Sequence, residues 1–265
     1  MDEDRWLASR FAPAPARARL VALYALNYEI ARTAEAVTQG GLGDIRLAWW
    51  SQAIDEIYAG KKPRAHPVLT AFAEAVRDAS LPRAPLDAMI AARGKDLDAA
   101  PFRTWIDLND YLEATAGNVM RLALTVCGAG LGEKAEPFVR AASVSWGYAG
   151  LLRAAPFWAQ RGRNFFPSRD MEHRYLDPAL MPVDFSGMSA GAVFTNMMER
   201  GRRAHAQVRD LGRRLPSAFF PAIGYLALAP LYYRALMAAQ APVAVSSALL
   251  RRQWSLLTAS ATGKL

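Results

Sequence analysis

Cysteine and histidine are scarce in this chain of 265 residues, which limits the metal and redox chemistry it can carry. The single cysteine, Cys127, lies in an apolar run, so an intrachain disulfide and a multi-cysteine metal site are excluded, and we expect a buried thiol. The three histidines, His66, His173 and His205, lack the spacing of a ligand pair on a helix. A zinc site is not expected.

Long uncharged hydrophobic runs are also absent. No run of about 18 or more apolar residues occurs without a charge, so a membrane-spanning helix is not expected. The acidic start, Met1 to Trp6, has no apolar segment of the kind found in secretory signals. We therefore expect a cytoplasmic protein, either soluble or peripheral to the inner membrane.

The chain is strongly basic, with a net charge of +8 and a pI near 9.9. Such an excess suits an acidic partner, and nucleic acid, an anionic membrane surface or a diphosphate substrate would each serve. A well-solvated basic surface without a partner explains the charge equally well. Because no zinc finger or RNP motif accompanies the charge, we do not expect nucleic acid as a partner.

Apolar residues recur at three- and four-residue spacing along nearly the whole chain, without a convincing alternating strand pattern. The sequence therefore predicts an all-α fold. Clusters of glycine and proline mark several of the helix boundaries. The expected helices run over residues 15–38, 43–59, 66–79, 84–99, 105–128, 133–159, 189–214, 218–239 and 243–258.

One domain over residues 1–265 is the simplest organisation, since no flexible linker or fixed-period repeat stands out. The least regular stretch, residues 160–188, is interrupted by prolines, and we expect a loop that crosses the mouth of a helical bundle. The last residues, 259–265, are expected to be frayed.

Several segments with recognisable spacing resemble one known family. They are Tyr24–Glu35, Asp96–Asp98, Asp107–Tyr111, Ala116–Gly117, Leu152–Trp158 and Arg161–Pro167. In this pattern the chain resembles the squalene/phytoene synthase family, over roughly residues 10–170. The resemblance implies an isoprenoid-synthase-type bundle of helices around a central cavity.

Members of that family hold Mg²⁺ and prenyl diphosphates with aspartates four residues apart, which lie on one face of a helix. In the first motif, Ala31 and Arg32 stand where the family has metal-binding aspartates, and Glu35 is the only carboxylate at such a position. In the second motif, Ala154 and Trp158 replace both aspartates. The metal-binding motifs are therefore degenerate, and a metal site is not expected.

Two aromatic residues of these segments have a structural and a functional interpretation. Tyr111 stands where the resemblance places a tyrosine implicated in the cyclopropyl step, and we favour a retained structural role in the bundle core. Trp158 would project where a metal cluster sits in active relatives, and we favour core packing over a ligand cage.

Four arginines are candidates for binding an anion or a diphosphate without metal, because a guanidinium group pairs with phosphate directly. They are Arg32, Arg153, Arg161 and Arg163. Pairing with local carboxylates, or exposure to solvent, is the alternative.

Because it lacks the aspartates of both motifs, the chain resembles in particular a non-catalytic branch of the family. This branch contains a phytoene-synthase-like assembly factor of mitochondrial complex I. We therefore predict a catalytically inactive assembly or interaction factor. Its expected partner is a subunit or assembly intermediate of respiratory complex I, with contact to an anionic membrane surface or an isoprenoid lipid as a further possibility. No cofactor is expected.

Two alternatives stay open. A head-to-head prenyltransferase acting on prenyl diphosphates with Mg²⁺ would need relocated ligands, drawn from Glu29, Glu35, Asp96 and Asp98. A lipid- or isoprenoid-binding protein would need an open apolar tunnel.

Overall fold

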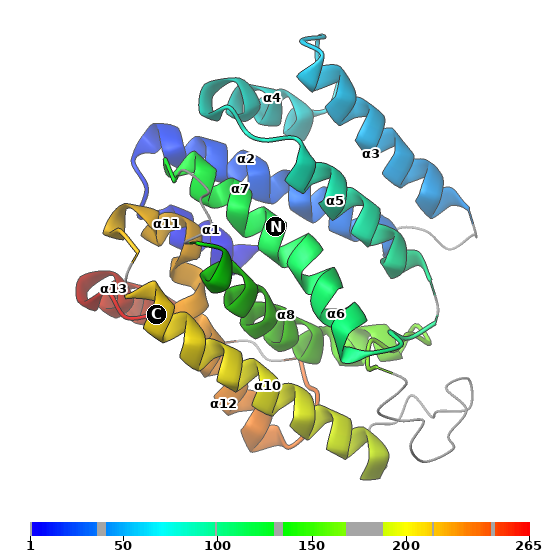
Figure 1. The fold of residues 1–265 in the computed structure, drawn as a ribbon, viewed down its shortest axis with the longest axis vertical. Coiled ribbons are helices and arrows are strands. Elements are labelled where there is room, and N and C mark those ends of the chain that lie inside the picture. Colours follow the sequence, from blue (N-terminus) through cyan, green and yellow to red (C-terminus); the bar gives the residue numbers. More distant parts are fainter. Residues whose placement is uncertain are drawn as a thin grey trace. The chain divides into compact units, whose positions relative to one another are not determined.

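The computed structural model describes residues 2–35, 41–98, 100–129, 135–167, 188–213, 215–244 and 247–265, and the regular elements among them are all helical (Figure 1). The all-α prediction is confirmed. The chain divides into two compact units, each assembled from three segments. The first unit comprises residues 1–97, 114–136 and 215–225, and the second comprises 98–113, 137–214 and 226–265. A single domain over residues 1–265 stays a prediction.

The first unit is organised around α2 (Ala14–Ala31), which packs against α4 (Pro67–Ala79) and α7 (Asn118–Val126) and lies beside both in Figure 1. The buried positions of α2 recur every three or four residues, which is the pattern of a helix with one face in the core. They include Leu20, Leu23, Tyr24, Asn27 and Ile30. The other elements are α1 (Glu3–Ser9), η1 (Arg32–Ala34), α3 (Leu42–Tyr58), α5 (Ala84–Ala92), η2 (Arg93–Leu97), η5 (Ser217–Phe219) and α11 (Phe220–Ile223).

The second unit is formed by longer helices. It contains α6 (Trp105–Leu112), all but the first residue of α8 (Glu136–Ala159), α10 (Met188–Gly212), α12 (Ala229–Ala239) and α13 (Leu249–Thr262). α10 and α12 pack side by side (Figure 1). Two short elements lie where the chain passes from one unit to the other, the π-helical segment η3 (Glu113–Gly117) and the 3-10 segment η6 (Gly224–Leu228).

Two glycines allow close approach between helices of the second unit. The side chain of Leu112 from α6 fills the space where Gly147 of α8 lacks a Cβ. In the same way, the ring and hydroxyl of Tyr233 from α12 occupy the space beside Gly201 of α10. The Tyr233 hydroxyl then donates a hydrogen bond to the backbone carbonyl of Ser145 on α8. One tyrosine therefore links three helices, and this requires glycine at position 201.

The structure follows most of the expected helices, but α2 ends at Ala31 rather than near residue 38, and α5 ends at Ala92 rather than near residue 99. It departs from the expected helices in four further places. The expected helix over 105–128 is divided by the π-helical segment η3, and the expected helix over 218–239 is a succession of short helical pieces. A first helix, α1, was not expected, because its seven residues are too few to show a period. The last helix begins at Leu249 rather than near residue 243.

The expectation of a frayed C-terminus is wrong. α13 continues to Thr262, and the side chain of Leu265 lies against Gly212 at the end of α10. The apolar end of the chain is therefore used in packing. Most of the expected loop over residues 160–188 lies outside the described residues, because the structure does not describe residues 168–187.

Two sequence expectations concern a thiol and membrane spans. Cys127 is partly buried, and this burial raises the pKa of its thiol to about 11, so it stays protonated at neutral pH.

Within the described ranges, one stretch, Ser217–Ala239, is long and apolar enough to cross a membrane by length and composition alone. Buried core segments pass the same test, and 56% of this window is buried.

The contact at Gly201 predicts opposite effects for the same substitution at two positions of α10. Gly201→Ala places a Cβ against Tyr233 and disturbs its hydrogen bond to Ser145, so we expect the free energy of unfolding to fall by about 3 kcal/mol. Gly191→Ala meets open space and should raise it by up to about 1 kcal/mol. Urea denaturation measures both. Equal effects at the two positions would contradict the described packing.

His205 of α10 makes the stability of the second unit sensitive to pH. Its burial, with a smaller contribution from the positive charge of Arg209, lowers the pKa of the imidazole from 6.5 to about 4. Between these values the unfolded chain binds a proton at this residue and the folded chain does not, so stability falls as the pH falls.

We expect this histidine to remove about 2 kcal/mol of unfolding free energy between pH 7 and pH 5. His205→Gln cannot titrate and should flatten the pH dependence by that amount. Urea denaturation of both proteins at several pH values is the measurement. Parallel stability curves for the two proteins would show that His205 does not carry this dependence.

Candidate functional site

The first motif begins in the core of the first unit. Tyr24 is fully buried, which raises the pKa of its phenol well above 10 and keeps it neutral. The guanidinium group of Arg5 lies 6.0 Å from the centre of the Tyr24 ring and 5.0 Å from that of Tyr225, and it forms an ion pair of 2.7 Å with Asp2. This part of the motif is therefore structural.

The end of the first motif, where metal-binding aspartates would stand, is exposed. α2 ends at Ala31, and the chain continues as the 3-10 turn η1. Arg32 and Glu35 form an ion pair of 3.9 Å, with side chains 48% and 40% exposed. At this exposure such a pair contributes about 0–1 kcal/mol. Glu35 therefore has a cation as its neighbour, and Ala31 offers no ligand atom.

The second motif occupies the last turns of α8 in the second unit. Leu152 is fully buried, while Ala154 is partly exposed and has no polar atom in its side chain. The guanidinium group of Arg153 lies over the ring of Tyr232 from α12, 3.7 Å from the ring centre. This close cation–π contact fixes Arg153 against the neighbouring helix.

Trp158 is packed among aromatic neighbours at the end of α8. Its ring meets Phe157 edge-on at 5.1 Å and Phe165 at 5.6 Å, and the Arg163 guanidinium lies 5.5 Å from its centre. The turn that follows α8 contains Gly162 in the left-handed conformation, at φ 68°. Trp158 itself is partly buried, and its role in core packing stays a prediction.

Among the described residues, one small cavity borders this turn. The cavity lined by Leu151, Ala155 and Phe165, among others, has a volume of about 10 Å³. A volume of this size holds about one water molecule and is far too small for a diphosphate.

All four candidate arginines lie over aromatic rings. Arg32 lies 5.2 Å from the ring centre of Tyr28, and Arg161 lies 3.6 Å from that of Phe157. Arg161 also donates to the backbone carbonyl of Phe157 at 3.2 Å. Their binding of an anion stays a prediction.

Tyr111 belongs to the core of the second unit. It is 8% exposed, and its ring lies 5.1 Å from that of Phe102. The neighbouring Tyr148 donates a hydrogen bond of 2.6 Å to Asn109, which joins α8 to α6. The structural role of Tyr111 stays a prediction.

Two of the carboxylates that could replace the lost aspartates have other partners. Asp96 is buried and forms an ion pair of 3.0 Å with Arg93, and Asp98 accepts a hydrogen bond from the backbone N–H of Ala100. Glu29 is partly exposed on α2. In the part of the chain that the structure describes, no three side chains of His, Cys, Asp or Glu gather in a way that could hold a metal ion.

The residues at the motif positions do not fit the Mg²⁺ ions that the family resemblance implies. Magnesium requires oxygen ligands, and two methyl groups, an indole and a guanidinium group stand where aspartates would be needed. The remaining Glu35 already pairs with Arg32. We therefore derive no reaction step through magnesium.

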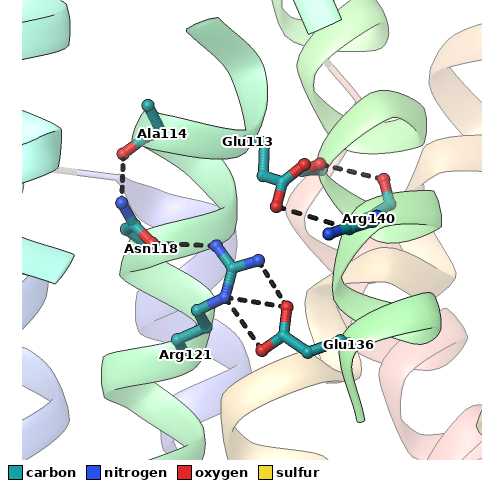
Figure 2. A network of polar contacts seen from close by, with 7 residues as sticks. Glu113, Ala114, Asn118, Arg121, Glu136 and Arg140 are labelled. Atoms are coloured by element: carbon teal, nitrogen blue, oxygen red, sulfur yellow. Dashed lines mark hydrogen bonds and ion pairs between the residues drawn. The ribbon is translucent and has the colours of Figure 1, made fainter. Parts of the chain in front are cut away.

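Sequence reasoning missed two groups of polar contacts, one in each unit (Figure 2). In the first unit, Arg121 of α7 makes a two-pronged ion pair with Glu136, with a shortest distance of 2.6 Å, and donates to the side chain of Asn118 at 2.8 Å. In the second unit, Glu113 pairs with Arg140 at 3.5 Å. No short motif signals pairs so far apart in sequence.

Comparison with known sequences supports the resemblance. The sequence model of the squalene/phytoene synthase family matches residues 1–258. NADH dehydrogenase (ubiquinone) complex I assembly factor 6 from Bos taurus is 32% identical over 169 residues, and the Homo sapiens protein is 30% identical. Each match covers 63% of this chain and 49% of the relative, so the chain spans about half the length of the curated relatives it matches.

Solved structures show the same fold. Squalene synthase HpnC from Alicyclobacillus acidocaldarius matches with a TM-score of 0.75 and 19% identity, covering 88% of each chain. A dehydrosqualene synthase solved in complex with ligand matches with a TM-score of 0.76 and 18% identity, covering 98% of this chain and 91% of the other. Together with the family match over nearly the whole sequence, these likenesses show that the chain belongs to the squalene/phytoene synthase family, a family of prenyltransferases.

Proposed function

We propose that this chain is a catalytically inactive member of its family and acts as an assembly factor for respiratory complex I. The observation that carries the proposal is the replacement of the metal-binding carboxylates by side chains that have other roles. Trp158 packs against Phe157 and Phe165, and Arg32 pairs with Glu35. An enzyme that ionises a diphosphate with Mg²⁺ needs carboxylates at these positions.

The curated relatives support the second half of the proposal. They are named as assembly factors of complex I, at 30–32% identity over 169 residues. The partner would then be a subunit or an assembly intermediate of complex I. The net charge of +8 supports attachment to an anionic membrane surface, so we place the protein in the cytoplasm, peripheral to the inner membrane.

A prenyltransferase that uses relocated ligands has less support. It needs several carboxylates at one place, whereas Glu35 pairs with Arg32 and Asp96 pairs with Arg93. The solved synthases resemble this chain at 18–19% identity, which supports a common fold and not a common reaction.

The first prediction of the proposal concerns turnover. Purified protein incubated with farnesyl or geranylgeranyl diphosphate and Mg²⁺ should release no pyrophosphate and form no squalene- or phytoene-type product, because the carboxylate ligands are missing. Release of pyrophosphate and product analysis by mass spectrometry are the measurements, with an active squalene synthase as control. Mg²⁺-dependent product formation would overturn the inactive assignment.

The second prediction concerns the cell. Deleting the gene in its native host should lower the amount of assembled complex I on native gels and its NADH:quinone oxidoreductase activity, because an assembly step is lost. Succinate dehydrogenase activity of the same membranes is the control and should not change. Complementation with the intact gene should restore complex I.

A contrary result is equally specific. Normal complex I in the deletion strain, together with the loss of an isoprenoid product, would support the prenyltransferase instead.

A further inference from the structure

A second cavity lies in the second unit, and none of the motif residues lines it. It is bordered by α10, α12, α13 and the last residues of the chain, and its volume is about 520 Å³. This size is within the range of pockets that bind small molecules. The residues that line it include Arg202, His205, Arg209, Tyr233, Arg234, Met237, Thr258, Thr262, Lys264 and Leu265.

The side chains that line the cavity concentrate positive charge, and the charged ones are exposed. Its lining contains four cations, Arg202, Arg209, Arg234 and Lys264, and no aspartate or glutamate. Among the described residues, none of the four forms an ion pair, and Arg202 contacts only the sulfur of Met237, at 3.6 Å. Like charges around one cavity repel each other, and a bound anion would relieve this repulsion.

Arg203, which follows Arg202 on α10, differs from the cations of the cavity because it has a carboxylate partner. Arg203 points to a different part of the surface and pairs with Glu199 at 3.2 Å, four residues earlier on the same helix. α10 therefore supplies a carboxylate partner for Arg203, while the cations of the cavity have none in the described chain. The charge of the cavity is a local feature and not only a consequence of the net charge.

Buried polar groups lie at the inner side of the cavity. His205 is 7% exposed, and its Nδ1 lies 3.3 Å from the hydroxyl of Ser145. The other ring nitrogen, Nε2, is buried and has no hydrogen-bond partner in the described part of the chain. Unsatisfied buried polar atoms are rare in folded proteins and suggest a missing partner.

The hydroxyl groups of the lining are already committed as donors. Ser255 donates to the carbonyl of Ala227, and Thr258 and Thr262 donate to carbonyls one turn earlier on α13. The groups left to donate to a ligand are therefore the cations, together with His205 Nε2 in the tautomer that carries a proton there. Such a donor set favours a compact, highly charged anion over an uncharged sugar or alcohol.

The remaining surface of the cavity is apolar, with Ala206, Pro230, Met237 and Leu265 in its lining. A volume of about 520 Å³ exceeds what a phosphate group alone would fill, so there is room for an apolar portion of the ligand.

We propose that this cavity binds an amphiphilic phosphate, with the phosphate group held by Arg202, Arg209, Arg234 and Lys264, and an apolar chain lying against Met237, Pro230 and Leu265. A soluble alkyl phosphate and the headgroup of an anionic phospholipid share this chemistry. The inference does not depend on the proposed role in complex I assembly.

Calorimetry tests the proposal with probes that separate the two sources. The soluble probes are inorganic phosphate, pyrophosphate and decyl phosphate below its micelle concentration, with decyl maltoside as the uncharged amphiphile. Vesicles of phosphatidylglycerol mixed with phosphatidylcholine are the lipid probe, and vesicles of phosphatidylcholine alone are their control. We expect decyl phosphate or the anionic vesicles to bind, and decyl maltoside and the neutral vesicles not to bind.

A pair of matched variants locates the site. Arg202→Gln with Arg234→Gln removes two charges from the cavity, whereas Arg203→Gln with Arg103→Gln removes two exposed charges that the cavity does not use. Each pair changes the net charge equally. We expect the cavity variant to lower the affinity by about tenfold or more, and the control variant to leave it nearly unchanged.

An NMR titration gives an independent readout. Resonances of the His205 ring, assigned with the variant His205→Gln, should move when the ligand binds and should stay unchanged with the cavity variant. Weaker vesicle binding by the cavity variant would identify a lipid headgroup as the source, and weaker binding of decyl phosphate alone would identify a soluble ligand. Equal losses in both variants, or no binding of any phosphate probe, would overturn the proposal.

Discussion

The hydrogen bond from Tyr233 to the backbone carbonyl of Ser145 fixes three helices of the second unit against one another. Tyr233 belongs to α12, its ring packs against Gly201 of α10, and its hydroxyl reaches the backbone of α8. A buried hydroxyl that loses its partner costs about 1–3 kcal/mol, so the three helices are held in one arrangement. The same arrangement places His205 beside Ser145 and brings α10 and α12 together where the basic cavity forms.

Aromatic packing and cation–π contacts are the main side-chain interactions described for the second motif. Trp158 and its neighbours fill the end of α8, and Arg153 and Arg161 lie over Tyr232 and Phe157. Cation–π contacts of this kind contribute about 0.5–2 kcal/mol each, depending on burial. A segment that holds metal carboxylates in active synthases, by family resemblance, is here stabilised by packing. The loss of the acidic residues therefore does not unravel the helix end.

The arginines that the structure describes fall into two groups, those with carboxylate partners and those without. Arg121 is almost buried and satisfied by Glu136, and Arg83 pairs with both Asp55 and Asp87. These pairs neutralise charge and connect helices or turns. The cations around the cavity of α10, α12 and α13 have no such partner among the described residues, although acidic side chains are available elsewhere on the surface. This difference distinguishes a ligand site from a merely basic surface.

The sequence by itself determined the helical class and most helix positions, because apolar spacing records which face of each helix is buried. It also determined that the metal motifs are degenerate, since Ala31, Ala154 and Trp158 cannot supply oxygen ligands to a metal. Only the tertiary structure decided the aromatic contacts of Trp158, the partners of Arg121 and the cavity that joins Arg202 to Lys264. Arg121 and Glu136, and likewise the residues of the cavity, lie far apart along the chain, and no local period or motif records a contact that close helix packing creates.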